Sequence, residues 1–315
     1  MTYRKGKLIV FGLSILLSCN IHSRPAHAQS SSRPLYDPGR IPWTELTFHA
    51  KNFWVEVSTT VQLTSIPVSE VESQLLAAPQ GMPIKPTSSQ VSQMTIRTTI
   101  DPIFRSPVTI YNRIWFDPTD ASALGRVRLR RGEDDFKKMY RFTRQGVFRH
   151  QIEPKDKKEA LLAPENWTHE SDNHYAYDPA ELGCSGVTER TLLIYILAAA
   201  DLSKIDNPIS LCVFDKRQLH RVQLKKSSLH PIAVNYIVKK QQSVTRNEIT
   251  IKALKIEIIT KPMESDLDEP ENFSFLGFQR DISLYIDPVS HLPIQTSGII
   301  TAIGHVDLKL SAANY

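Results

Sequence analysis

Hydrophobic and polar residues alternate with a period of two over most of the chain. The alternation runs through residues 94–100, 108–116, 232–238 and 249–258, and turn sequences such as Asp117-Pro118-Thr119-Asp120 separate the runs. A period of two is typical of strands that bury one face, and short turns between such strands favour antiparallel pairing. The pattern therefore predicts a mainly β protein built on antiparallel sheet.

Residues 125–152 combine this alternation with many positive charges. Val127 and Leu129 alternate with arginines, and two turn sequences divide the segment into a three-strand meander. Its basic residues are Arg126, Arg128, Arg130, Arg131, Lys137, Lys138, Arg141, Arg144, Arg149 and His150. Alternation alone predicts a solvated face on which arginine stems cover apolar surface. The alternative is a surface that meets anionic lipid headgroups or phosphates.

One segment, Thr191–Leu202, interrupts the alternation. It contains nine consecutive apolar residues, and its leucines and alanines favour helix. Nine residues are too few to cross a bilayer, which needs about 20. We expect a short helix that is buried on all sides, with Leu193, Ile196 and Leu197 as candidates to line a ligand cavity. A fully buried strand is the alternative, because an apolar run does not separate the two.

The N-terminus has the pattern of a secretory signal. Three basic residues precede an apolar stretch over residues 8–17, and Ala26-His27-Ala28 fits an A-x-A cleavage site. We expect a signal peptide over residues 1–28 and export to the bacterial periplasm. The alternative is a membrane-anchored lipoprotein, because residues 16–19 resemble a lipobox in which Cys19 would carry the lipid.

Removing this segment changes the charge of the chain. Four of the 38 Lys and Arg residues lie within residues 1–28 and none of the 33 Asp and Glu residues does, so the remainder has a net charge of +1. A nearly neutral chain gives no argument for nucleic-acid binding. We expect a flexible lead-in over residues 29–39 and a single domain over residues 40–315.

Two signals precede the apolar helix. Asp178–Glu181 combines an N-cap Asp, a Pro at the first helical position and a Glu three residues after the cap. It predicts one helical turn that ends at Gly183, before the main helix starts near Thr188. Cys184 and Cys212 are the two cysteines outside the signal. Three alternatives remain for them: a disulfide in an oxidising compartment, two buried thiols, or a catalytic thiol before a helix.

The sequence predicts no catalytic residue and no cofactor. The sharp turn G-x-S-x-G of serine hydrolases is absent. Metal-competent side chains gather in a predicted exposed loop over residues 167–177, namely His169, Glu170, Asp172 and His174, but their spacing matches no zinc signature. The acidic segment 264–271 lacks the glycine of a calcium loop, so we expect a mobile hairpin tip there. We therefore predict neither a metal site nor an enzyme.

The C-terminal half resembles a family of exported bacterial proteins of unknown function that are similar to periplasmic lipoprotein carriers. The resemblance covers residues 188–312 and rests on the helix 191–202, the strand pair PISLCVFDKRQLHRVQL, and the segments SLYIDPVSHLPIQTSG and GHVDLKL. It implies a long curved antiparallel sheet that forms an unclosed barrel around a short apolar helix. It also implies a cavity that accepts acyl chains, although no site residue transfers by motif.

Three functions follow as hypotheses. The first is a periplasmic binding or carrier protein for an acyl-chain ligand, a lipid or a lipoprotein, and a wide apolar cavity would favour it. The second is an envelope structural or assembly factor that pairs a sheet edge with a protein partner. The third is a hydrolase whose site has no recognisable motif, for which a cluster of His, acid and Ser would be the sign.

Overall fold

The computed structural model describes residues 36–204, 207–263, 272–301 and 303–315. The chain divides into two units, Met1–Arg33 and Pro34–Tyr315, and the described residues all belong to the second. The predicted signal peptide, Cys19 and the acidic segment 264–271 lie outside the described residues.

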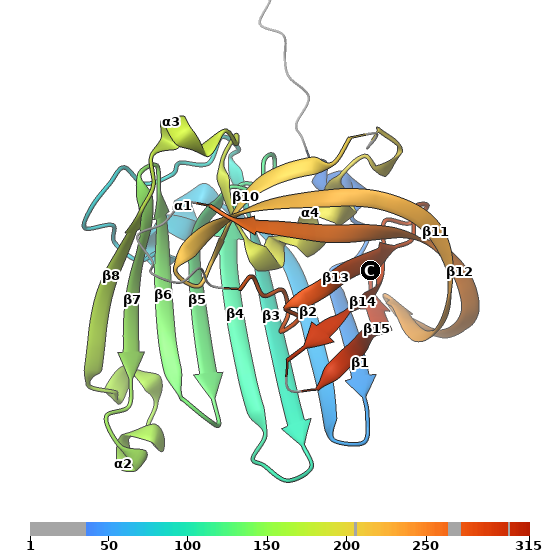
Figure 1. The fold of residues 1–315 in the computed structure, drawn as a ribbon, viewed down its shortest axis with the longest axis horizontal. Coiled ribbons are helices and arrows are strands. Elements are labelled where there is room, and N and C mark those ends of the chain that lie inside the picture. Colours follow the sequence, from blue (N-terminus) through green and yellow to red (C-terminus); the bar gives the residue numbers. More distant parts are fainter. Residues whose placement is uncertain (1–35, 205–206, 264–271, 302) are drawn as a thin grey trace, which may run out of the picture. The chain divides into compact units, whose positions relative to one another are not determined.

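The described residues form one sheet of fifteen strands (Figure 1). The strands are β1 (Glu45–Lys51), β2 (Val55–Pro67), β3 (Gln90–Pro102), β4 (Val108–Phe116), β5 (Ala123–Arg131), β6 (Phe136–Thr143), β7 (Gly146–Glu153), β8 (His169–Ala176), β9 (Val187–Glu189), β10 (Ile209–Asp215), β11 (Gln218–Lys240), β12 (Ser243–Pro262), β13 (Arg280–Ile286), β14 (Pro293–Ile300) and β15 (Gly304–Asn314). Their order across the sheet is β8-β7-β6-β5-β4-β3-β2-β1-β15-β14-β13-β12-β11-β10-β9. Neighbouring strands are antiparallel except β9 and β10, which are parallel.

The sheet curls without closing. At its far end β11 pairs a second time, in parallel, with β15, where Ile237–Lys239 lies beside Ala312–Asn314. The strands β11 to β15 therefore form a partial ring, while β8 and β9 remain as unjoined ends of the sheet. The long β11–β12 hairpin bends across the inside of the sheet in Figure 1. The predicted unclosed antiparallel barrel is confirmed.

The apolar segment is a helix, as predicted, and lies inside the curl. Helix α4 spans Leu193–Ala199, and all seven of its side chains are buried. The Tyr195 hydroxyl donates to the Pro118 carbonyl at 2.6 Å, and its ring lies 4.6 Å from that of Phe116. The helix ends earlier than the sequence predicted, because the backbone is already extended at Ala200.

The remaining helices are short. They are α1 (Val68–Val71), α2 (Lys157–Ala160), α3 (Pro179–Leu182) and the 3-10 turns Pro38–Arg40, Glu72–Gln74, Pro164–Asn166, Arg190–Leu192 and Leu202–Lys204. The predicted turn after Asp178 is confirmed as α3, because the Asp178 carboxylate accepts from the Ala180 amide and Gly183 adopts the left-handed conformation. No helix in the described ranges is both long and apolar enough to span a membrane.

Three local predictions need correction. Residues 36–39, assigned to a flexible lead-in, belong to the folded unit, because Tyr36 is buried and the Asp37 amide donates to the Ala199 carbonyl. The stretch near Thr188, predicted to begin a helix, is strand β9, since it pairs with β10. The predicted loop 167–177 is mostly strand β8, which pairs with β7 over its whole length. β8 is an edge strand that is largely open to solvent. Because polar residues occupy successive positions in it, its sequence shows no alternation with a period of two.

Candidate ligand-binding site

The candidate site begins on the inner face of β5, β6 and β7. Side chains alternate along a strand, so Arg126, Arg128 and Arg130 of β5 share one face. That face lies inside the curl, because Arg126 forms an ion pair with Glu189 of β9, from the other end of the sheet. The predicted solvated arginine face is therefore wrong. The outer face is also covered: Val127 packs against a cluster around Trp115 that the α1 segment helps to bury.

Around Arg126, the positive charges of this inner face are balanced by carboxylates. Arg126 Nη1 lies 2.8 Å from Glu189 Oε1, and the two side chains are 2% and 0% exposed. Arg190 Nη1 lies 2.6 Å from Asp215 Oδ1 and also donates to the Ser274 carbonyl. Two buried cations thus face two buried carboxylates, and the network ties β9 and β10 to β5.

Three other cations on the same face have no such partners among the described residues. We call Arg128, Lys138 and Arg149 the inner cation cluster. Arg128 and Lys138 lie directly opposite each other on β5 and β6, an arrangement of like charges that is normally unfavourable. None of the three forms an ion pair with a carboxylate of the described chain, and the buried Nε atoms of Arg128 and Arg149 have no hydrogen-bond partner there.

Aromatic rings position the cluster. The Phe136 ring lies 5.3 Å from the Arg128 guanidinium and 4.2 Å from the Lys138 ammonium. The Tyr175 ring lies 5.4 Å from the Arg149 guanidinium. Cation–π contacts of this kind stabilise a positive charge but do not neutralise it.

Burial and mutual repulsion alter the acid–base properties of the cluster. Burial, followed by the positive charges of Arg190 and Arg126, lowers the pKa of Arg128 to about 9. Burial, followed by the charges of Arg149 and Arg128, lowers the pKa of Lys138 to about 8, and Glu153 acts in the opposite direction. Both groups remain protonated at pH 7, so the face is positively charged and partly dehydrated, as suits an anion.

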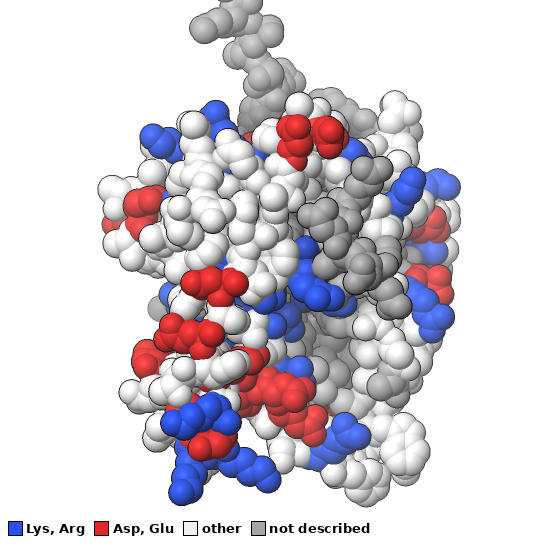
Figure 2. Space-filling view, turned by 60° about the vertical axis from the view of Figure 1, so that its left-hand side comes forward, with Lys and Arg blue, Asp and Glu red and all other residues white. Residues whose placement is uncertain are grey.

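A cavity of about 1180 Å³ adjoins the cluster. It lies between β8, α3 and the strands β10, β11 and β12. Its lining comprises His174, Tyr175, Ala176, Tyr177, Asp178, Glu181, Leu182, Phe214, Arg217, Gln218, Leu219, Arg221, Lys261, Pro262 and Met263. Tyr175 connects the two parts, since its ring is 5.5 Å from that of Phe214 and also contacts Arg149. Figure 2, turned toward the β8 side, shows a hollow with Lys and Arg atoms in its depth.

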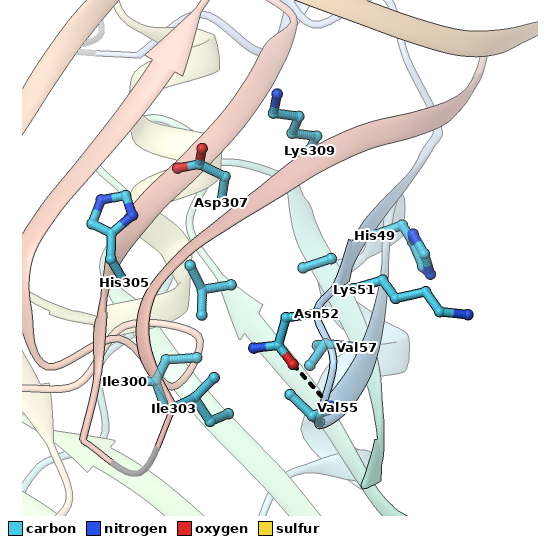
Figure 3. Close-up of a pocket in the computed structure, with 12 residues that line it drawn as sticks. His49, Lys51, Asn52, Val55, Val57, Ile300, Ile303, His305, Asp307 and Lys309 are labelled. Carbon is cyan, nitrogen blue, oxygen red and sulfur yellow. Dashed lines mark hydrogen bonds between the residues drawn. The ribbon is translucent and has the colours of Figure 1, made fainter. Parts of the chain in front are cut away.

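A smaller pocket of about 330 Å³ lies between the β1–β2 connection and strands β14 and β15 (Figure 3). Apolar side chains including Val57, Ile300 and Ile303 line one part of it, and His305, Asp307 and Lys309 line another. Its size is at the lower limit for a small-molecule site. We therefore regard the larger cavity as the better candidate.

The structure places the predicted site residues as follows. Leu193, Ile196 and Leu197 are fully buried in the core, and neither pocket is lined by them. Cys184 and Cys212 form a disulfide with their Cα atoms 5.9 Å apart, which excludes both thiol alternatives. No cluster of three metal-competent residues occurs in the described chain. The predicted group on β8 disperses: Asp172 contacts His150 at 2.7 Å, and His174 lines the cavity.

Sequence reasoning named the members of the inner cation cluster but not the cavity. Tyr175 and Phe214 are separated from the cluster by tens of residues, and no motif joins them. No family model, curated protein or solved structure matches the chain. The resemblance to lipoprotein carriers stays a prediction.

Proposed function

We propose that this protein is a binding or carrier protein for an acyl-chain ligand, a lipid or the lipid part of a lipoprotein, and that it acts in the periplasm. The observation that carries the proposal is the cavity of about 1180 Å³ whose wall includes Tyr177, Leu182, Phe214, Leu219 and Met263. Moving an acyl chain from water into such a site contributes about 0.8 kcal/mol per buried CH₂.

The compartment rests on two supports. The sequence over residues 1–28 has the pattern of a signal peptide. The Cys184–Cys212 disulfide fits an oxidising environment such as the periplasm.

A second candidate is an envelope assembly factor, and the edge strand β8 is the observation that favours it. Within the described sheet β8 pairs only with β7, and most of its residues are exposed. An open edge of eight residues can add a strand from a partner. However, His169, Glu170 and Asp172 place ionisable groups on it, a common device against edge pairing. The carrier function therefore ranks first.

The test is to fill the cavity. Met263→Trp puts a large side chain on the cavity wall, and Met82→Trp makes the same change at an exposed site that is not part of the lining. We expect the wild type to bind a fluorescent fatty-acyl probe, Met263→Trp to bind it at least fivefold more weakly, and Met82→Trp to bind it normally. Native mass spectrometry of protein purified from its own periplasm should show a co-purifying lipid.

The carrier proposal fails if the wild type binds no acyl probe and carries no lipid. Equal probe binding by both tryptophan variants would place the acyl chain somewhere other than this cavity. Melting temperatures of both variants control for loss of folding.

A further inference from the structure

Among the described residues, the inner face of β5 to β7 carries an excess of positive charge. Arg126 and Arg190 are matched by Glu189 and Asp215. Beside these pairs, the inner cation cluster carries three positive charges on the same face. The nearby Glu153 carboxylate accepts a hydrogen bond from the Gln151 side chain and forms no ion pair with the cluster among the described residues.

The described part of the chain supplies no ion-pair partner for this cluster. Two like charges directly opposite on neighbouring strands destabilise a sheet, and partial burial adds a desolvation cost. Sites that accept such a cost commonly serve a ligand. The ligand that offsets three cations is an anion.

The donors present favour one kind of anion. Two guanidinium groups and one ammonium group, on three adjacent strands, supply more donors and more charge than a single carboxylate can match. A phosphate group carries a charge of about −1.5 to −2 and three strong acceptor oxygens. Arginine forks bind such oxygens in pairs, and a lysine adds a point charge.

The cluster also lies where a headgroup would have to lie. The Tyr175 ring forms part of the cavity wall and contacts Arg149 on the cluster side. An amphiphile with its chain in the cavity would bring its polar end past this ring. We propose that Arg128, Lys138 and Arg149 form a subsite for the phosphate group of an amphiphile whose acyl chain occupies the adjacent cavity, an inference that rests on the proposed carrier function.

Calorimetric titration of the purified protein with three probes tests this. Dodecyl phosphate carries both chain and anion, dodecyl maltoside carries the same chain with an uncharged headgroup, and inorganic phosphate carries the anion alone. Alkyl probes are kept below their micelle-forming concentrations. We expect dodecyl phosphate to bind at least tenfold more tightly than dodecyl maltoside, and inorganic phosphate to bind weakly and compete with dodecyl phosphate.

Neighbouring lysines of β6 provide a matched pair of variants. Lys138 lies on the inner face, whereas Lys137 lies on the outer face and pairs with Glu165. We expect Lys138→Met to weaken dodecyl phosphate binding at least tenfold and to leave dodecyl maltoside unchanged. Lys137→Met should change neither, and Lys138→Arg should keep most of the affinity because it keeps the charge.

Each other outcome has one meaning. If the two alkyl probes bind equally and Lys138→Met has no effect, the phosphate subsite is refuted while the carrier function stands. If inorganic phosphate binds and no alkyl probe does, the proposed function fails but the anion site survives. If no probe binds, both are refuted. Circular dichroism of each variant confirms that the sheet is intact.

Discussion

Arg126 and Arg128 lie two residues apart on one strand and one face, yet their surroundings differ. Arg126 is buried and pairs with Glu189, and its guanidinium carbon lies 5.0 Å from the centre of the Tyr140 ring. Arg128 contacts Phe136 and has no carboxylate partner in the described chain. Because Glu189 of β9 reaches only the first of the two, Arg126 is part of a buried ion pair. Arg128 is one of the three cations for which we propose an anionic ligand.

The buried Arg126–Glu189 pair should be more sensitive to the loss of one charge than the inner cation cluster. Glu189→Gln leaves the buried Arg126 without its counter-charge, and breaking a buried pair in this way costs about 3–5 kcal/mol of unfolding free energy. Urea denaturation measures the loss. The double variant Arg126→Met with Glu189→Leu should recover much of it, since the buried charges that remain, Arg190 and Asp215, pair with each other. If Glu189→Gln lowers the free energy of unfolding by less than about 1 kcal/mol, this ion pair does not stabilise the fold substantially.

Core packing around helix α4 should give the next largest effect. Leu193 is fully buried on helix α4 and lines neither pocket. Leu193→Ala should therefore cost about 2–5 kcal/mol of unfolding free energy and leave the affinity for an acyl probe unchanged. Thermal melting measures the effect on stability, and probe titration on the same samples measures the effect on affinity. Weaker probe binding with an unchanged melting temperature would instead show that the ligand reaches the helix.

Removing a charge from the inner cation cluster should have the opposite effect and raise the free energy of unfolding. Lys138 has a pKa of about 8 in the folded chain against the ordinary 10.5. Between these values the unfolded chain binds more protons, so the stability of the wild type should rise with pH from about 8 to 10.5. Below pH 8 the full cost of the charge is present. Lys138→Met should therefore stabilise the protein at pH 7, by about 1 kcal/mol after allowance for solvent screening.

Denaturation at pH 7 and pH 10 checks this prediction. Lys138→Met should show a smaller rise between these pH values than the wild type, because only the lowered pKa of Arg128 still contributes, and Lys137→Met should show the full rise. A destabilised Lys138→Met at pH 7 would mean that the ammonium group supports the fold and is not kept for a ligand.

The sequence predicted much of the local structure. The period of two located most strands, and the composition of Leu192–Ala200 located α4. The alternation also showed that Arg126 and Arg128 share a face, but not that this face is the inner one. That depends on β9, which lies some sixty residues further along the chain, and on the α1 segment that covers Val127 from outside. The cavity depends likewise on β8 meeting β10 to β12, contacts that no local pattern specifies.

The position of β1 in the sheet has a consequence for how the chain folds. β1 lies between β2 and β15, with Glu45 opposite Asn314. The centre of the sheet is thus completed by a pairing that spans nearly the whole chain. Such distant contacts require closure of a very long loop and slow the search for the native state. The sheet therefore cannot become continuous across β1 until β15 has been synthesised.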